Sequence, residues 1–134
     1  MDRVLIVDDE DIILDTVGEA VEKFGFRVIK AKSATEALSI FHEKQPGIVI
    51  TDLNLGGDAD GVSLCSRIRY EDKSVMVLAM SGFFSEYDEI YCLEVGFTDF
   101  LVKPVQLDAL CSAVQCAFDR RFRWKNIVER KTSK

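Results

Sequence analysis

Two short apolar segments that both end on carboxylates restrict the fold more than any other feature of this sequence. The segment Gly47–Thr51 is rich in β-branched residues and is followed directly by Asp52. Val4–Val7 is a similar segment, and Asp8 and Asp9 follow it. Continuous apolar segments of this length are typical of strands buried on both faces of a parallel sheet. If the two strands are parallel neighbours, the three acids converge at the carboxyl edge of the sheet, where open α/β sheets bind ligands.

The three converging acids predict a divalent metal site. Neighbouring carboxylates repel one another, and their pKa values rise unless a cation lies between them. Mg²⁺ takes a few carboxylate ligands and retains several waters, so Asp8, Asp9 and Asp52 suit this ion. A simpler interpretation is that the acids after the first strand only favour the N-terminus of a helix. That interpretation explains Glu10 and Asp11, but it does not explain Asp52.

The rest of the chain alternates between strand and helix patterns. The predicted strands cover residues 3–8, 26–31, 47–52, 74–80 and 99–102. The predicted helices cover residues 10–23, 33–41, 61–70 and 85–94, and a last helix begins near 106. Five such units in succession predict a three-layer α/β fold with right-handed crossovers. We expect a flavodoxin-like sheet of five parallel strands in the order 2-1-3-4-5 with five helices, which places the first and third strands together.

Composition and charge predict one acidic domain, residues 1–118, with a basic C-terminal segment, residues 119–134. That segment holds seven basic and two acidic residues, so its net charge is +5 and residues 1–118 carry −11 of the total of −6. An acidic body does not favour nucleic-acid binding. No segment is long and apolar enough for a membrane span or a signal peptide. The four cysteines lack metal-binding spacing and suit a reducing compartment, so we expect a cytoplasmic protein.

Five polar residues follow the predicted strands in an order that resembles a known family, namely Asp8, Asp9, Asp52, Ser81 and Lys103. These residues lie on alternate strand–helix turns. The set resembles the receiver domain of response regulators from two-component phosphorelay systems. The resemblance covers residues 3 to about 118. It implies a signalling domain that accepts a phosphoryl group and then changes a surface used for output or dimerisation.

The resemblance also gives each residue a role. It implies that Asp52 is the carboxylate nucleophile that takes a phosphoryl group from a sensor histidine kinase or a phosphotransfer protein. Asp9, Asp52 and the backbone carbonyl of Asn54 would bind Mg²⁺ directly, and Asp8 would reach the metal through water. Lys103 would pair with a phosphoryl oxygen, where its charge aids phosphoryl transfer.

A conformational switch is the second implication of the resemblance. Ser81 matches a hydroxyl that moves to the phosphoryl group, and Phe100 matches an aromatic side chain that turns inward with it. Pro104 matches a proline whose preceding peptide bond is often cis, which aims the lysine.

The loop after Asp52 departs from the family pattern. Gly56 stands where the family usually has proline, and Gly61 stands one position later than the family's glycine. A longer loop that contains Gly56 and Gly57 has many accessible backbone states. We therefore expect the Asn54 carbonyl to be held less firmly, which leaves the metal affinity open.

Three other functions are compatible with parts of this pattern. An FMN carrier shares the predicted fold, but the acids that follow Val7 would repel the flavin phosphate. A degenerate receiver would serve only for docking and never accept phosphate, although all five key positions are intact here. A haloacid-dehalogenase-like phosphatase also uses an aspartyl nucleophile, but it expects a second aspartate where this chain has Asn54.

The basic C-terminal segment is predicted to continue the last helix, because residues 107–131 contain no glycine or proline. We expect the sheet-facing side of this helix to comprise Leu107, Leu110, Cys111, Val114, Ala117 and Phe118. A coiled-coil spacing of three and four residues also joins Leu110, Val114, Ala117, Arg121, Trp124 and Val128. Aromatic residues on a basic helix favour a partner. We expect the segment to form a homodimer or to lead to an output domain outside this sequence, and the alternative is that it folds back on the acidic body.

Overall fold

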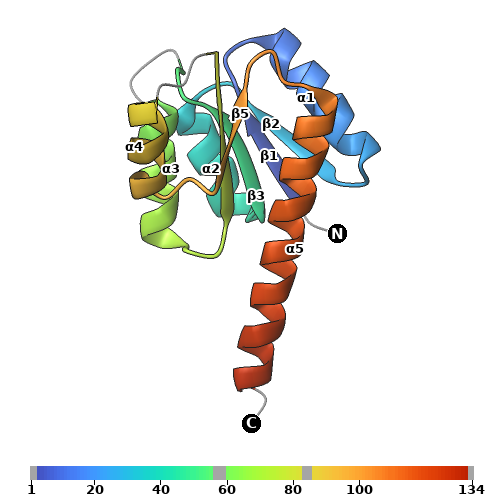
Figure 1. The fold of residues 1–134 in the computed structure, drawn as a ribbon, viewed down its shortest axis with the longest axis vertical. Helices are drawn as coiled ribbons and strands as arrows, with labels where there is room; N and C mark the ends of the chain where they lie inside the picture. The colour runs from blue at the N-terminus through green and yellow to red at the C-terminus, as the bar shows by residue number, and fades with distance from the viewer. Residues whose placement is uncertain (1–2, 56–59, 83–85, 133–134) are drawn as a thin grey trace.

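Strands and helices alternate along the whole chain (Figure 1). The computed structural model describes residues 3–55, 60–82 and 86–132. The strands are β1 (Arg3–Val7), β2 (Arg27–Ala31), β3 (Ile48–Asp52), β4 (Met76–Ser81) and β5 (Asp99–Val102). The helices are α1 (Asp11–Lys23), α2 (Ala34–Lys44), α3 (Gly61–Glu71), α4 (Glu86–Val95) and α5 (Leu107–Thr132). The predicted succession of five strand–helix units is confirmed.

The five strands form one parallel sheet in the order β2-β1-β3-β4-β5, which confirms the predicted topology. All five residues of β3 are buried, as expected for a central strand with helices on both faces. β2 lies at one edge of the sheet and is only partly buried. The central pair is β1 and β3, with Val7 opposite Thr51, so the residues that follow these strands lie next to each other.

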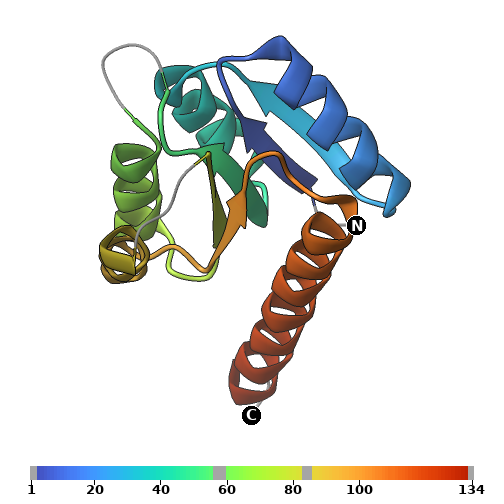
Figure 2. The ribbon, with the colours of Figure 1, turned by 45° about the horizontal axis from the view of Figure 1, so that its top comes forward.

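Helices cover both faces of the sheet (Figure 2). Strand residues alternate between the two faces, so each face has its own apolar cluster. One cluster joins the sheet to α1 and α5 and includes Ile6, Ile50 and Val114. The other joins the sheet to α2, α3 and α4 and includes Val49 and Leu64.

Short polar contacts set several of the helix ends. The side chain of Ser33 accepts a hydrogen bond from the Glu36 amide at 3.1 Å and so caps the start of α2. Gly25 follows the last turn of α1 with φ of 100°, a left-handed conformation that glycine adopts readily. The predicted start of the fourth helix, Ser85, lies outside the described residues.

The sheet-facing side of α5 differs in part from the prediction. Leu110, Val114 and Ala117 are buried against the sheet, whereas Leu107 is 62% exposed and Cys111 is also exposed. The reason is the helical period, because each residue is rotated by about 100° from the one before it. Leu107 and Cys111 lie one turn apart at the border of the buried stripe, and Leu107 faces α1 rather than the sheet.

The extension of α5, residues 119–134, begins at a helical turn that packs against the body of the domain. The Phe118 ring stacks with Phe122 at 6.3 Å and meets Phe26 edge-on at 5.5 Å between ring centroids. Arg121 lies over Gly47, where an added Cβ would overlap its guanidinium, and it donates a long hydrogen bond of 3.5 Å to the Ser74 carbonyl. Beyond this turn the helix projects past the sheet (Figures 1 and 2).

Candidate phosphoryl-acceptor and metal site

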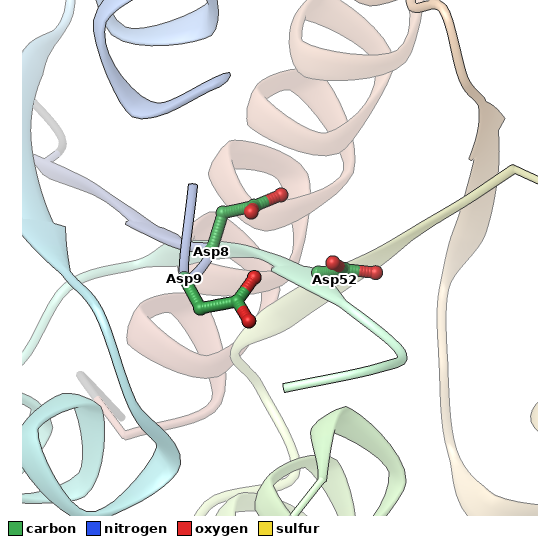
Figure 3. A group of neighbouring side chains, drawn as sticks. All are labelled: Asp8, Asp9 and Asp52. Carbon is green, nitrogen blue, oxygen red and sulfur yellow. The ribbon is translucent and has the colours of Figure 1, made fainter. Parts of the chain in front are cut away.

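Three carboxylates meet at the carboxyl edge of the sheet. Asp8 and Asp9 directly follow β1, and Asp52 is the last residue of β3. Their carboxylate oxygens include one set in which all three lie within 4.8 Å of one another (Figure 3). Asp8 is fully buried and Asp52 is 7% exposed, whereas Asp9 is exposed. The predicted convergence is therefore present, and it opens to solvent on the side of Asp9.

Lys103 lies between two of these acids. Its Nζ donates to Asp8 Oδ2 at 2.8 Å and to Asp52 Oδ2 at 3.0 Å. Burial alone would lower the pKa of Lys103, but its hydrogen bonds to Asp8 and Asp52 and their negative charges raise it above the ordinary value. The lysine is therefore an ammonium at neutral pH, and it offsets part of the repulsion between the two buried carboxylates.

Backbone amides hold the other oxygens of the same two acids. Asp8 Oδ1 accepts from the Glu10 amide at 2.9 Å, and Asp52 Oδ1 accepts from the Asn54 amide at 3.1 Å. Each buried carboxylate thus has one oxygen on the main chain and the other on Lys103. A carboxylate oxygen has two lone pairs, so these bonds fix the orientation of the groups and leave capacity for a further ligand.

Ser81 and Lys103 belong to neighbouring strand ends at the same edge. Ser81 ends β4, which pairs with β3, and it is 6% exposed. Its carbonyl accepts a hydrogen bond of 2.8 Å from the Lys103 amide. The Lys103–Pro104 peptide bond is cis. The structure therefore brings Asp52, Ser81 and Lys103 to adjacent positions, as the sequence predicted.

Phe100 lies farther from the edge than the other predicted residues. It is on β5 opposite Ala79, two residues before Ser81 on the paired strand. Its side chain is half-buried and packs against the cluster that joins the sheet to α2, α3 and α4. The loop glycines Gly56 and Gly57 lie outside the described residues.

Gly61 supports the site in a way that the sequence did not predict. A Cβ at this position would overlap the backbone carbonyl oxygen of Asp52 and would lie 3.0 Å from Leu53 Cα. The Gly61 amide also donates to the Leu53 carbonyl at 3.1 Å. The start of α3 can therefore approach the end of β3 only because residue 61 has no side chain. The one sequence signal for this contact was a glycine at the first position of a helix, where the backbone conformation does not require glycine and close packing is the remaining reason for it.

The donor set suits a hard divalent cation. Asp8, Asp9 and Asp52 supply only carboxylate oxygens, which Mg²⁺ prefers, and they lie at an edge open to water. Two of the acids are buried with a single ammonium as partner, so a cation would offset their remaining charge. These observations fit Mg²⁺ at this edge of the sheet.

Comparison with known proteins identifies the family. The family model of the response regulator receiver domain matches residues 4–115. The chain belongs to the response regulator receiver domain family. Receiver domains are part of two-component systems, and this family is not a classical enzyme family.

Individual relatives resemble the chain over most of its length. The transcriptional regulatory protein PrrA of Mycobacterium tuberculosis is 35% identical over 119 residues, which cover 89% of this chain and 51% of PrrA. The probable transcriptional regulator ycf27 of Guillardia theta is 34% identical over 116 residues, which cover 84% of this chain and 45% of ycf27. The chain thus spans about half the length of the curated relatives it matches.

Solved receiver structures share the fold. A response regulator from Chloroflexus aurantiacus matches 87% of this chain and 96% of its own, with a TM-score of 0.81 and 30% identity. A receiver domain protein from Clostridium thermocellum matches 92% of this chain and 99% of its own, with a TM-score of 0.86 and 28% identity. Within the described residues, no helix is both long enough and apolar enough to span a membrane.

Proposed function

We propose that this receiver domain accepts a phosphoryl group on Asp52 in a Mg²⁺-dependent reaction. The donor is the phosphohistidine of a sensor histidine kinase or of a phosphotransfer protein. One carboxylate oxygen of Asp52 forms the new P–O bond, while the P–N bond of the phosphohistidine breaks and its electron pair returns to the imidazole. The observation that supports this most is the ammonium of Lys103, which lies 3.0 Å from Asp52 and 2.8 Å from Asp8 beside the exposed Asp9.

The other groups at the edge act on the charge of the transferred group. Bound Mg²⁺ would be held by Asp9, Asp52 and the Asn54 carbonyl, with Asp8 reached through water, and it would neutralise phosphoryl charge. Lys103 would bond one phosphoryl oxygen, since its ammonium is already at hydrogen-bond distance from Asp52.

After transfer, the new oxygens on Asp52 would attract nearby donors. The Ser81 hydroxyl would bond one of them, and the half-buried Phe100 would repack when the end of β4 moves. The domain would then catalyse only its own phosphorylation and dephosphorylation. We also propose a cytoplasmic location, in keeping with the family and with four free cysteines.

Incubation with acetyl phosphate and Mg²⁺, followed by intact-mass measurement, tests the chemistry. We expect one added phosphoryl group on the wild type and on Asp108→Asn, a matched control because Asp108 is exposed on α5. Asp52→Asn should gain none. Full labelling of Asp52→Asn would show another acceptor, and no labelling of the wild type would favour a receiver that serves only for docking.

Residues 119–134 need a separate proposal, because the family match ends at residue 115. We propose that residues 1–118 are the receiver domain and that the extension connects it to another unit. That unit is a second copy of the chain or an output domain beyond this sequence. The support is the projection of the helix past the sheet with Phe122, Trp124 and Ile127 about half exposed.

A further inference from the structure

One side of the extension forms an exposed apolar surface next to the amino edge of the sheet. Trp124 is 53% exposed and Val128 is 42% exposed. Together with Ser74, Arg121 and Lys125, they line a hollow of about 240 Å³. Because Ser74 precedes β4, this hollow lies in the angle between the projecting helix and the amino edge of the sheet.

The direction of this surface restricts how a second helix can lie on it. Val114, Ala117 and Arg121 face the body, and Trp124 and Val128 continue the same stripe at steps of three and four residues. In a parallel pair joined by this stripe, residues 107–121 of the partner would occupy the space of this copy's own sheet. The predicted coiled-coil seam is therefore wrong for its first half, since Leu110, Val114 and Ala117 are buried in their own domain.

An antiparallel partner meets no such obstacle. Its residues 107–121 would lie beyond the end of this helix, and only its last turns would rise toward the amino edge of the sheet. From Arg121 to Thr132 the helix extends about 17 Å, which is room for about three turns. Two such ends can lie side by side with Trp124 of each copy near Val128 of the other.

Charge also favours the antiparallel arrangement. Two extensions that each carry +5 repel one another in either orientation, so acidic residues near the helix ends decide which orientation is favoured. In the antiparallel arrangement, each basic end approaches the amino edge of the other sheet, where two acidic residues lie at the end of α3. Glu71 and Asp72 line a hollow of about 310 Å³ that shares Arg121 with the Trp124 hollow.

We propose that two copies of this chain pair through the Trp124 and Val128 surfaces of their α5 extensions in antiparallel orientation. Each helix end then approaches the base of the other copy's sheet. This inference takes a second copy as the unit that the proposed function joins to the extension, and it is independent of phosphoryl transfer to Asp52. The apolar area is small compared with a stable interface, so the dimer is weak and depends on concentration.

Sedimentation up to about 1 mM chain tests the surface, because an interface this small suits a weak association constant. The wild type should become dimeric as concentration rises, and Trp124→Ser should remain monomeric. Phe122→Ser is the matched control, because Phe122 has a similar exposure but stacks on Phe118 instead. A monomeric wild type, or equal dimerisation of the wild type and Trp124→Ser, would overturn the proposal. Equal loss in both variants would also contradict the assigned surface.

Spin-label distances test the orientation. The labels are placed on Asp119→Cys or Asn126→Cys in a background that lacks the exposed Cys111 and Cys116. These two positions share the side of the helix opposite the Trp124 stripe. An antiparallel pair centred near residue 126 separates the residue 119 labels by an additional ~21 Å along the axis. Equal distances at both positions would mean a parallel pair and would refute the orientation, whereas the acetyl phosphate assay on Asp52 would be unaffected.

Discussion

Replacing Gly61 with alanine is expected to destabilise the domain and to slow phosphorylation at Asp52. The added Cβ would overlap the Asp52 carbonyl oxygen and lie 3.0 Å from both Asp52 C and Leu53 Cα. All of these are backbone atoms, so no side-chain rotation can relieve the contact. Overpacking of this kind costs about 1–3 kcal/mol, whereas alanine recovers up to ~1 kcal/mol of helix propensity over glycine. We therefore expect a net loss of roughly 1–2 kcal/mol.

Urea denaturation of Gly61→Ala and Gly82→Ala measures this loss. Gly82 is the matched control, because no atom lies within 4 Å of a Cβ added there. A net loss of this size corresponds to a fall in melting temperature of about 4–8 °C for a domain of this length. Labelling by acetyl phosphate should also slow by about tenfold, since displacement of a reacting group by a fraction of an ångström reduces rate strongly. Equal denaturation midpoints for the two variants would refute the packing argument.

Three further outcomes are expected from the site and the thiols. Mg²⁺ at about ten times its dissociation constant should stabilise the wild type by ~1.4 kcal/mol, and Asp9→Ala should lose most of that shift in a thermal melt; equal shifts would place the metal elsewhere. In the native protein a thiol reagent should modify the exposed Cys111 and Cys116 first, with Cys65 reacting only after unfolding; rapid labelling of all four thiols would contradict the described burial. Burial raises the pKa of Cys65 to about 12, whereas the unfolded chain regains the ordinary value of 9.0. This thiol therefore leaves the free energy of unfolding unchanged below pH 9 and lowers it as pH rises from 9 toward 12. In urea titrations at several pH values, Cys65→Ala should lose less stability at alkaline pH than the wild type.

The sheet order could be predicted because the strand signals were strong and ended on chemically distinctive residues. Ile48–Asp52 begins with three apolar residues and ends on an acid, which indicates both a central position and a functional end. Convergence of Asp8, Asp9 and Asp52 then followed from topology alone. Helix limits were less certain by one or two residues, since hydrophobic periodicity fades at helix ends.

Contacts between distant segments could not be predicted in the same way. The spacing around Arg121 is equally consistent with an inter-chain seam and with contact to the same domain, and only tertiary packing on Gly47 and Ser74 distinguishes them. Likewise, Gly61 contacts the backbone of Asp52 across a nine-residue interval, which no local propensity encodes. Leu107 shows the same limit, because periodicity places it only at the border of the buried stripe, and the packing of α5 beside α1 leaves it exposed.

The course of α5 gives the molecule a lever arm. Its first turn follows the β5 end that carries Lys103 at the carboxyl edge, and Arg121 rests on Gly47 and Ser74 at the amino edge. The part beyond Arg121 is about 17 Å long, so a tilt of about 5° at that support would displace Thr132 by ~1.5 Å. The arm from Leu107 to Arg121 is about 21 Å, so a movement at the carboxyl edge would reappear at the far end of the helix in the opposite direction and at similar size. A fluorophore there would report the state of the acceptor site from the opposite edge of the sheet, where it cannot disturb the carboxylates.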